Sequence, residues 1–530
     1  GEYEFIQDAI QKGLKKVDIA LISAVDAIGN SSVLIDNVLS AIDMDCQYER
    51  ERRVSYDYDD IKNQVKPSVI PLWDQTGPVL CKIISLCDVN AGTLRHFPAL
   101  AKSVEDQLLN EDIIVEFDVL YADARLTDNG PKYTNPIKIS SSEHLCSWNQ
   151  NLVFEDLPWH DLPRESIAQI TVLHRVSNKG ALEAQNKRLD SDVPLFITRF
   201  PLIDSDCVLV SGRKKLKMWP IVPGIEPTKV TTINQFDAAC TISIEFATNL
   251  TPVMYTETGT LPKHLTSLYS EYQMKMTKKY PNVMDEITKE LNDIINSDCL
   301  YQLNEREKWR MFHFAKKYLN EPKALSKYLL SVPWRYPKAR QIAHDFLKTW
   351  KRVETINALE LLDTRFADTC VRQYAVSILS ELPDDQFNLF LLQLVQCLKN
   401  ELYHDSPLAR LLLERSLRST HQIGHAFFWS LKAELHNSDC KERFIYMIEE
   451  YLKAANSHRI QLTNQISLVN SLLEFALKVK RYNTKSVHER KLYFQELLKE
   501  YQFKKCVLPL NPRMEVTNLI VSKCKVMGSK

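Results

Sequence analysis

The stretch from Asp385 to Lys399, DQFNLFLLQLVQCLK, indicates which kind of fold the second half of the chain adopts. Its large apolar residues recur at intervals of three and four positions, which places them on one face of an α-helix. They are Phe387, Phe390, Leu391, Leu394, Val395 and Leu398. Residues 407–417 repeat this pattern. Breaks at Pro322, Pro333, Pro383 and Pro407 divide the region into helices of ordinary length. Residues 301–503 are therefore predicted to form an all-α solenoid of the HEAT type, with a compact bundle as the alternative.

Upstream of this helical region, residues 71–250 have the pattern of short strands separated by polar turns. The expected strands are Val79–Cys87, Ile113–Tyr121, Pro136–Ser140, Ser147–Phe154, Ile167–His174, Leu195–Arg199, Val208–Val210, Leu216–Trp219 and Cys240–Phe246. No long helical pattern separates them, which favours antiparallel pairing over βαβ units. We therefore expect an antiparallel β-sandwich in this region, with an insertion at 91–109.

The remaining segments are shorter and incomplete as folding units. Residues 1–25 have the pattern of a helix followed by a strand, 26–70 and 251–300 are expected to be linkers, and 504–530 return to strand-like sequence around Val516–Val521. Residues 270–280 in particular are expected to be a polar connection. The chain opens on Gly1 and closes directly after a strand-like run, so we expect it to be an excerpt of a longer protein.

Composition excludes several classes of protein. The 530 residues include 67 Lys+Arg and 67 Asp+Glu, so attraction to nucleic acid or to an anionic membrane is not a property of the whole chain. The 12 cysteines contain no C-x-x-C pair, and we expect a reducing cytoplasm. Glycine, also 12 residues, is never clustered into a phosphate-binding loop. We find no catalytic triad, no complete metal site and no nucleotide fingerprint.

One concentrated group of cations lies on a turn of the predicted sandwich. Arg213, Lys214, Lys215 and Lys217 are natural partners for phosphate and are predicted to contact an anionic membrane; a solvated turn is the alternative. Calcium-binding sandwiches gather carboxylates from several loops. The candidates here, Asp123, Asp128, Asp190 and Asp192, are too scattered to predict such a site.

Two histidines in the helical region have a spacing that could place them on one helical face. His421 and His425 are four residues apart, but a third ligand is missing and Gly424 indicates that the helix is only starting there. Packed or capping histidines are the favoured interpretation. Another helix start is expected at Asn304, because Asn304 can cap the helix and Glu307 can reach back to it.

Several segments, taken in order, resemble the class I phosphatidylinositol 3-kinase catalytic subunits. Leu209–Pro220 (LVSGRKKLKMWP), Trp148-Asn149, Leu157-Pro158 and Leu162-Pro163-Arg164 resemble parts of their C2 domain. Ala358–Asp363 (ALELLD), Val371–Val376 (VRQYAV), Leu391–Lys399, Tyr403–Leu417 and Ile423–His436 resemble their accessory helical domain. Tyr3–Ser23 is similar to the end of the Ras-binding domain, and Leu508–Pro512 with Lys523–Lys530 to the entry of the kinase small lobe.

This resemblance implies a division of the chain and a function. It implies the end of a Ras-binding domain at 1–25, a C2 sandwich at 71–250, the helical domain at 301–503 and the start of the kinase domain at 504–530. The parent protein would phosphorylate the 3-hydroxyl of inositol lipids with ATP and magnesium. This chain would carry no catalytic, cofactor-binding or metal-binding residue, and would serve as its regulatory, membrane-positioning portion.

The resemblance also implies partners and a location. They are a regulatory adaptor subunit, a Ras-type GTPase and a phosphoinositide-containing membrane, with no nucleic acid, for a cytoplasmic protein recruited to the plasma membrane. In some family members an acidic stretch at the start of the helical domain contacts the adaptor. Glu305 matches one acidic position, whereas Gln302 and Arg306 depart from the pattern. Glu305 is therefore expected on a regulatory surface. The alternative function is a non-enzymatic membrane-coat or scaffold protein that combines a lipid-binding sandwich with a solenoid.

Overall fold

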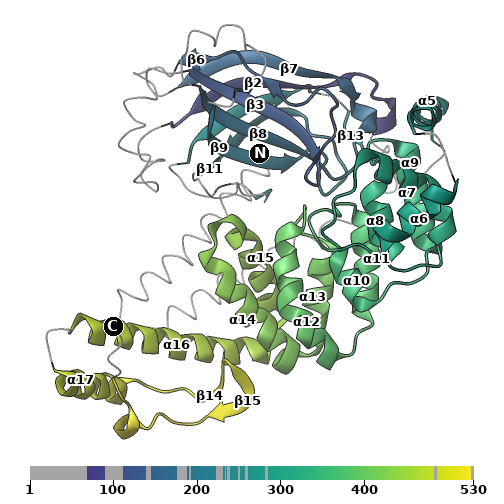
Figure 1. The fold of residues 1–530 in the computed structure, drawn as a ribbon. Coiled ribbons are helices and arrows are strands. Elements are labelled where there is room, and N and C mark those ends of the chain that lie inside the picture. The colour runs from purple at the N-terminus through teal and green to yellow at the C-terminus, as the bar shows by residue number, and fades with distance from the viewer. Residues whose placement is uncertain are drawn as a thin grey trace, which may run out of the picture. The chain divides into compact units, whose positions relative to one another are not determined.

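The computed structural model describes residues 69–89, 112–138, 145–175, 188–189, 192–221, 231–232, 234, 239–248, 251–256, 261–280, 284–482 and 486–526. The predictions for 1–25 and for the insertion at 91–109 therefore lie outside the described residues, as does nearly all of the linker at 26–70. Two kinds of structure make up the described part: β-sheets in the first half and helices in the second (Figure 1).

The β-rich part is a sandwich of two antiparallel sheets. The smaller sheet has four strands in the order β10-β12-β2-β7, which are Gly212–Lys217, Thr241–Phe246, Pro78–Cys87 and Cys146–Pro158. The larger sheet has the order β11-β9-β8-β3, which are Trp219–Pro220, Val193–Pro201, Ser166–Arg175 and Asp112–Tyr121. Three short strands also pair with β3: β4 (Ala124–Arg125), β5 (Lys132–Tyr133) and β6 (Ile137–Lys138). The predicted antiparallel sandwich is confirmed.

The sandwich core follows from the alternation of side chains along each strand. In β2, Val79, Cys81 and Ile83 are buried while the residues between them are more exposed, because successive side chains of a strand point to opposite faces. Phe117 on β3 and Phe154 on β7 bring their rings to 5.4 Å between the two sheets. The expected strand at Val208–Val210 is wrong, since the described contacts there are isolated bridges. A short parallel pair, β1 (Ile70–Pro71) with β13 (Val253–Met254), completes this part.

In the described residues between 263 and 500, the structure consists of helices and their connections, with no strand among them. Its helices are α5 (Lys263–Lys279), α6 (Met284–Ile295), α7 (Glu305–Phe314), α8 (Ala324–Ser331), α9 (Pro337–Thr349), α10 (Thr355–Glu360), α11 (Thr369–Ser380), α12 (Asp384–Cys397), α13 (Pro407–Arg418), α14 (His425–Ala433), α15 (Ser438–Ala454), α16 (Ser457–Arg481) and α17 (Val487–Glu500). Neighbouring helices such as α7 with α8, α10 with α11 and α14 with α15 pack against each other, and helices α5 to α16 contribute to one hydrophobic core, as expected of stacked helical pairs.

The predicted helix signals agree with this arrangement. On α12, Phe387, Leu391, Leu394 and Val395 are buried, and Pro407 occupies the first turn of α13. The prediction that residues 251–300 form a linker is wrong, because helices α5 and α6 lie within this range. Its polar stretch at 270–280 forms the second half of α5, which buries only Leu265 and Tyr269 and so shows little hydrophobic periodicity.

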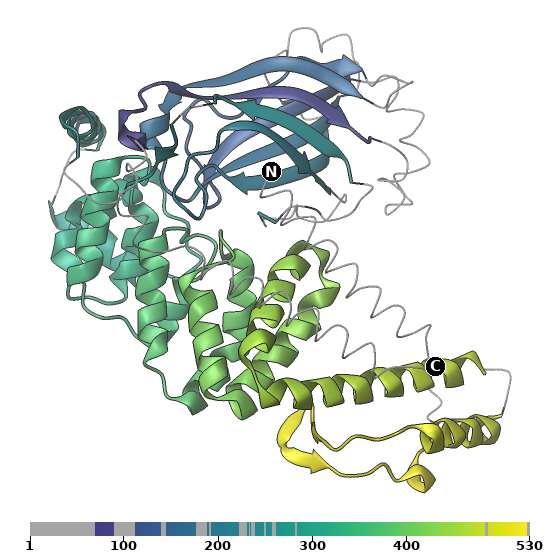
Figure 2. The same cartoon turned by 180° about the vertical axis from the view of Figure 1, so that it is seen from behind.

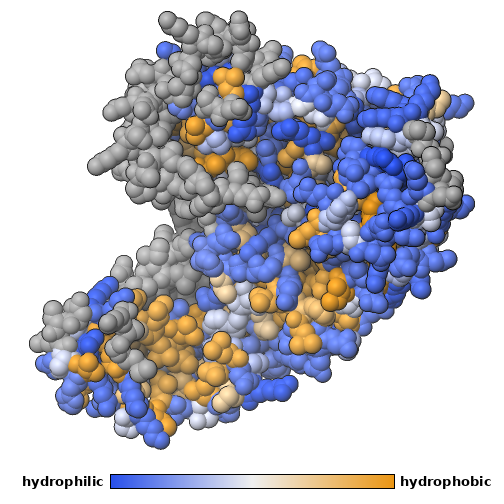
Figure 3. Space-filling view, in the orientation of Figure 1, coloured by the Kyte–Doolittle hydropathy of each residue, from blue (hydrophilic) through white to orange (hydrophobic). Residues whose placement is uncertain are grey.

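A hairpin follows the helical part. Strands β14 (Cys506–Leu508) and β15 (Asn511–Val516) pair with each other, and β14 contacts α16 (Figure 2). The strand expected at Val516–Val521 is therefore wrong: the chain leaves β15 at Val516. Apolar side chains gather on the surface over α16 (Figure 3), where Leu473 and Leu477 are exposed.

Candidate functional site

The four predicted membrane-contact residues all lie on β10, the edge strand of the smaller sheet, so the prediction that they lie on a turn is wrong. Because side chains alternate along a strand, Arg213, Lys215 and Lys217 lie on the face opposite Leu216, which is buried in the core. Arg213, Lys214 and Lys215 are exposed, whereas Lys217 is half-buried. The structure therefore places three cations on the outer face of the sheet and Lys214 at its rim.

The neighbouring strands leave this outer face positive. Lys215 and Lys217 stand opposite Ser243 and Thr241 of β12, and Arg213 stands opposite Glu245. That carboxylate also lies 4.0 Å from Nζ of Lys82 on β2. Glu245 is the one acid among the β12 residues that stand opposite these cations, so the cations of β10 outnumber the acids facing them.

Because β10 is an edge strand, its cations can also serve to protect the edge of the sheet. An edge strand presents unpaired backbone groups, and charged side chains there, lysine especially, prevent pairing with another sheet. Edge protection needs a charge of either sign, whereas contact with anionic lipid needs a positive one. This difference lets an experiment separate the two roles.

Glu305 lies at the start of α7, where the predicted cap is confirmed. The Asn304 side chain accepts from the backbone N–H of Glu307 at 3.0 Å, and the Glu307 carboxylate accepts from the N–H of Asn304 at 2.8 Å. Glu305 itself is 72% exposed and pairs with Nζ of Lys308 at 3.0 Å. Its charge is thus available at the surface, and a carboxylate in the first turn also favours the helix dipole.

An open pocket of about 470 Å³ adjoins this helix start. Its walls carry charges of both signs: Glu286, Lys289, Glu290, Asp293, Arg306 and Glu307. Arg306, which departs from the pattern expected from the resemblance, has its guanidinium 3.6 Å from the Glu290 carboxylate. The surface around Glu305 is therefore mixed in charge.

The calcium candidates do not converge. Asp192 is buried and forms a bidentate salt bridge with Arg175, with N–O distances of 2.9 and 2.7 Å. Asp128 is exposed and lies 3.4 Å from Arg335, and Asp190 lies outside the described residues. Within the described ranges, no group of three carboxylates comes close enough to share an ion.

Of the two histidines singled out from the sequence, His425 is packed, as favoured there, whereas His421 is exposed. His425 begins α14, is buried, and its Nε2 lies 2.8 Å from the carbonyl of Pro509. His458 on α16 joins them, with ring centroids 5.8 Å from His421 and 6.1 Å from His425. Their ring nitrogens do not meet the spacing of a shared ion, a condition that only His344, Asp368 and Cys370 meet in the described part of the chain.

The sequence did not indicate how the sandwich and the helical part are joined. Arg335, between α8 and α9, donates to the Asp161 carboxylate at 3.1 Å and to the Leu126 carbonyl at 3.4 Å. The carbonyl of Asp156 accepts a third bond from it. Beside it, Trp334 stacks on Tyr121 of β3 with centroids 5.5 Å apart. A guanidinium is suited to this position because its fixed fork of donors can satisfy several oxygens at once.

A second group of buried contacts joins the two parts further along the solenoid. Glu165, next to β8, accepts from the backbone N–H of Thr369 at 2.9 Å and from its hydroxyl at 2.6 Å. Burial and the nearby negative charge of Asp368 raise the pKa of Glu165 to about 7. Tyr403 donates to the Ile203 carbonyl at 2.8 Å. These contacts fix the sandwich on the helical part through polar groups that are costly to leave unpaired.

The fold defines a class of protein in which a C2-type sandwich packs on a helical-repeat domain. Comparison with family models narrows the class. Residues 110–252 match the phosphoinositide 3-kinase C2 model, and residues 278–464 match the accessory domain (PIK domain) of the phosphoinositide 3-kinase family.

Curated relatives agree with these matches. Phosphatidylinositol 3-kinase 2 of Dictyostelium discoideum is 31% identical over 458 residues, covering 79% of this chain and 24% of that protein. Phosphatidylinositol 3-kinase 1 of the same organism is 32% identical over 390 residues, covering 73% of this chain and 24% of that protein. The chain belongs to the phosphoinositide 3-kinase family, and it spans about a quarter of the length of these relatives. Of the helices that the structure describes, none has the length and apolar character needed to cross a bilayer.

Proposed function

We propose that this chain is the regulatory, membrane-positioning portion of a phosphatidylinositol 3-kinase. The parent protein would transfer phosphate from ATP, with magnesium, to the 3-hydroxyl of inositol lipids. The observation that carries the proposal is the presence of both family domains in one chain, joined by the buried contacts of Arg335 and Glu165. A sandwich fixed to the helical part by buried contacts can set the orientation of the domains that pack on the helical part.

Strand β10 supplies the membrane contact in this proposal. A Lys or Arg near an anionic leaflet contributes about 1 kcal/mol, so Arg213, Lys214, Lys215 and Lys217 together would contribute up to roughly 4 kcal/mol. The contribution falls with salt, since exposed charges are screened over about 8 Å at physiological ionic strength. Attraction of this size suits reversible recruitment to the cytoplasmic face of the plasma membrane.

Protein partners form a separate part of the proposal. The exposed carboxylate of Glu305 would contact a basic surface on a regulatory adaptor subunit, with the mixed charges around it limiting the strength of that contact. A Ras-type GTPase is proposed only from the resemblance of residues 3–23, which lie outside the described residues.

A lipid kinase assay on the full-length gene product tests the enzymatic part of the proposal. The purified protein is incubated with ATP, magnesium and vesicles containing phosphatidylinositol. Phosphate on the inositol 3-hydroxyl is the expected result. A full-length protein that binds the vesicles and transfers no phosphate would instead support the scaffold alternative. Translation of the transcript beyond Lys530 adds a direct check, since a kinase requires an Asp-Phe-Gly and an Asp-x-x-x-x-Asn catalytic loop there.

A further inference from the structure

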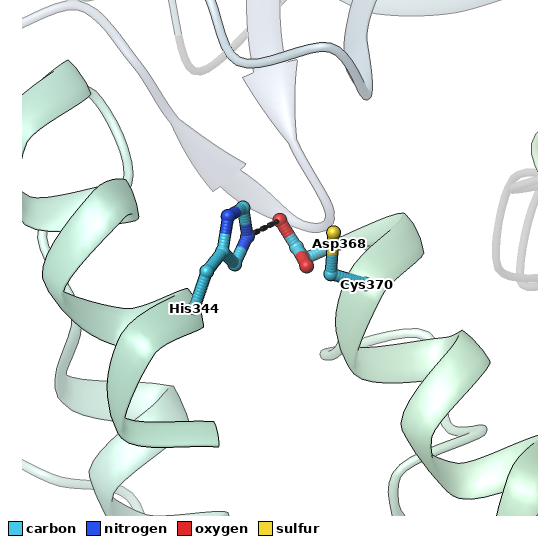
Figure 4. A group of neighbouring side chains, drawn as sticks. All are labelled: His344, Asp368 and Cys370. Atoms are coloured by element: carbon cyan, nitrogen blue, oxygen red, sulfur yellow. Dashed lines mark hydrogen bonds and ion pairs between the residues drawn. The ribbon is translucent and has the colours of Figure 1, made fainter. Parts of the chain in front are cut away.

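Three side chains with different metal-ligand atoms converge where α9 meets the start of α11. His344 projects from α9, Asp368 immediately precedes α11, and Cys370 is the second residue of that helix (Figure 4). One ligand atom from each lies within 4.8 Å of the other two, and Nε2 of His344 is 2.9 Å from Oδ2 of Asp368. In the portion of the chain that the structure describes, this is the one group of three or more such residues with that spacing.

The local structure holds these donors in place before any ion binds. The Asp368 carboxylate caps α11, with Oδ1 accepting from the N–H of Val371 at 3.0 Å, which leaves Oδ2 directed at His344. Cys370 lies in the first turn of α11, where the positive end of the helix dipole stabilises a thiolate. His344 packs against the ring of Trp334, a residue of the junction with the sandwich. Ligands held by their own secondary structure lose little entropy on binding an ion.

The donor set selects the kind of metal. Imidazole nitrogen, carboxylate oxygen and thiolate sulfur together suit Zn²⁺, which binds such ligands at about 2.0–2.3 Å in a tetrahedron. In such a tetrahedron the ligand atoms lie about 3.3–3.7 Å apart, so the 2.9 Å between Nε2 of His344 and Oδ2 of Asp368 would lengthen slightly, and the other separations, now within 4.8 Å, would adjust to the same spacing. One carboxylate and one thiolate balance the charge of the ion. His344 and Cys370 are only partly buried, so a water molecule can reach the fourth position.

We propose that His344, Asp368 and Cys370 form a zinc site that ties α9 to α11 beneath the sandwich. The role is structural, since three protein ligands would hold α9 against the start of α11, where Thr369 contacts the sandwich, and would keep His344 beside Trp334 at the junction.

Cobalt titration of the full 530-residue chain, stripped of metal with a chelator, tests the proposal. Tetrahedral Co²⁺ bound to a thiolate gives a sulfur-to-metal charge-transfer absorption, which reports the bond to Cys370 directly. The expected result is one equivalent of Co²⁺ with this absorption, displaced by Zn²⁺. Absence of the absorption in the unaltered, folded chain would overturn the proposal.

Two variants make the test specific. Cys370→Ser should abolish the charge-transfer absorption, and His344→Gln should weaken Co²⁺ binding by roughly tenfold or more. Cys299→Ser is the matched control, because Cys299 is exposed and outside the cluster. Asp368 is left intact, since it caps α11. Circular dichroism confirms that each variant is folded. An unchanged absorption in Cys370→Ser would contradict the site.

Discussion

Arg335 donates to the carboxylate of Asp161 across 174 positions of sequence, with 3.1 Å between Nε and Oδ2. Asp161 belongs to the sandwich side of the junction and Arg335 to the helical side. The guanidinium is only 18% exposed and the carboxylate 7%. A charge pair this buried joins the two domains only while both partners are present, because the buried carboxylate of Asp161 would lose the donor that compensates its charge if Arg335 were removed.

Arg335→Ala is therefore expected to destabilise the chain by about 2–4 kcal/mol, since it leaves Asp161 and the carbonyl of Leu126 without their donor. Urea denaturation of the 530-residue chain measures the loss. Arg410→Ala is the matched control: its pair with Asp405 is exposed, so little change is expected. Equal effects of the two substitutions would show that Arg335 is not a structural link.

Gly424 is required by close packing. A Cβ there would lie 2.6 Å from the backbone carbonyl of Ser416 and would also overlap the hydroxyl of Tyr451. Gly424→Ala should cost about 1–3 kcal/mol of unfolding free energy despite the better helix propensity of alanine. Gly77→Ala is the control, because nothing lies within 4 Å of its Cβ position. A stable Gly424→Ala chain would mean that Tyr451 moves aside freely.

His458 makes the helical part sensitive to acid. Burial, followed by the neighbouring His425 and His421, lowers the pKa of His458 to about 4, and Tyr451 holds its Nδ1 at 2.8 Å. The unfolded chain therefore binds more protons than the folded one between about pH 6.5 and 4, so stability falls as the pH falls through this range.

The contribution of His458 can be isolated by substitution. His458→Gln should reduce the loss of stability between pH 7 and pH 5 by about 1–2 kcal/mol, because glutamine stays neutral. Denaturation midpoints of both proteins at the two pH values supply the comparison. Parallel pH profiles for the two proteins would indicate that His458 titrates normally in the folded chain.

Charge reversal at Glu305 should affect binding and leave folding intact. The side chain is exposed and the cap of α7 is made by Asn304 and Glu307, so Glu305→Lys should unfold at the same urea concentration as the unaltered chain. Under the proposed function, its expected effect is weaker inhibition of the full-length protein by the proposed adaptor subunit. Glu500→Lys, another exposed acid at a distant helix end, is the control. If adaptor inhibition and basal activity are both unchanged, Glu305 has no regulatory role.

The elements governed by local sequence were the ones that could be predicted. The helix at Asp384–Cys397 follows from its periodic apolar residues, and the start at Glu305 from its capping box. Helix α5 was missed, because it buries only Leu265 and Tyr269. A polar helix of this kind is stabilised by its neighbours, in this case through the stacked rings of Tyr272 and Tyr336, 4.5 Å apart.

The junction could not be predicted, for a different reason. Arg335, Glu165 and Tyr403 stand in ordinary polar contexts, and their partners lie about 170 or more positions away. Only the fold brings these groups together. The same holds for His344 and Cys370, which no short motif connects. By contrast, the cations of β10 were visible as a run, although the sequence alone did not show that three of them share the outer face of an edge strand.

The most direct test of the central claim is co-sedimentation of the 530-residue chain with vesicles of phosphatidylcholine alone and with added phosphatidylserine. We predict binding to the anionic vesicles that falls with salt, and loss of that binding when Arg213, Lys214, Lys215 and Lys217 are all changed to Ala. Changing the four to Glu keeps the edge of the sheet charged and should also abolish binding while the protein stays monomeric. Undiminished binding to anionic vesicles by either variant would contradict the assignment of β10 to the membrane.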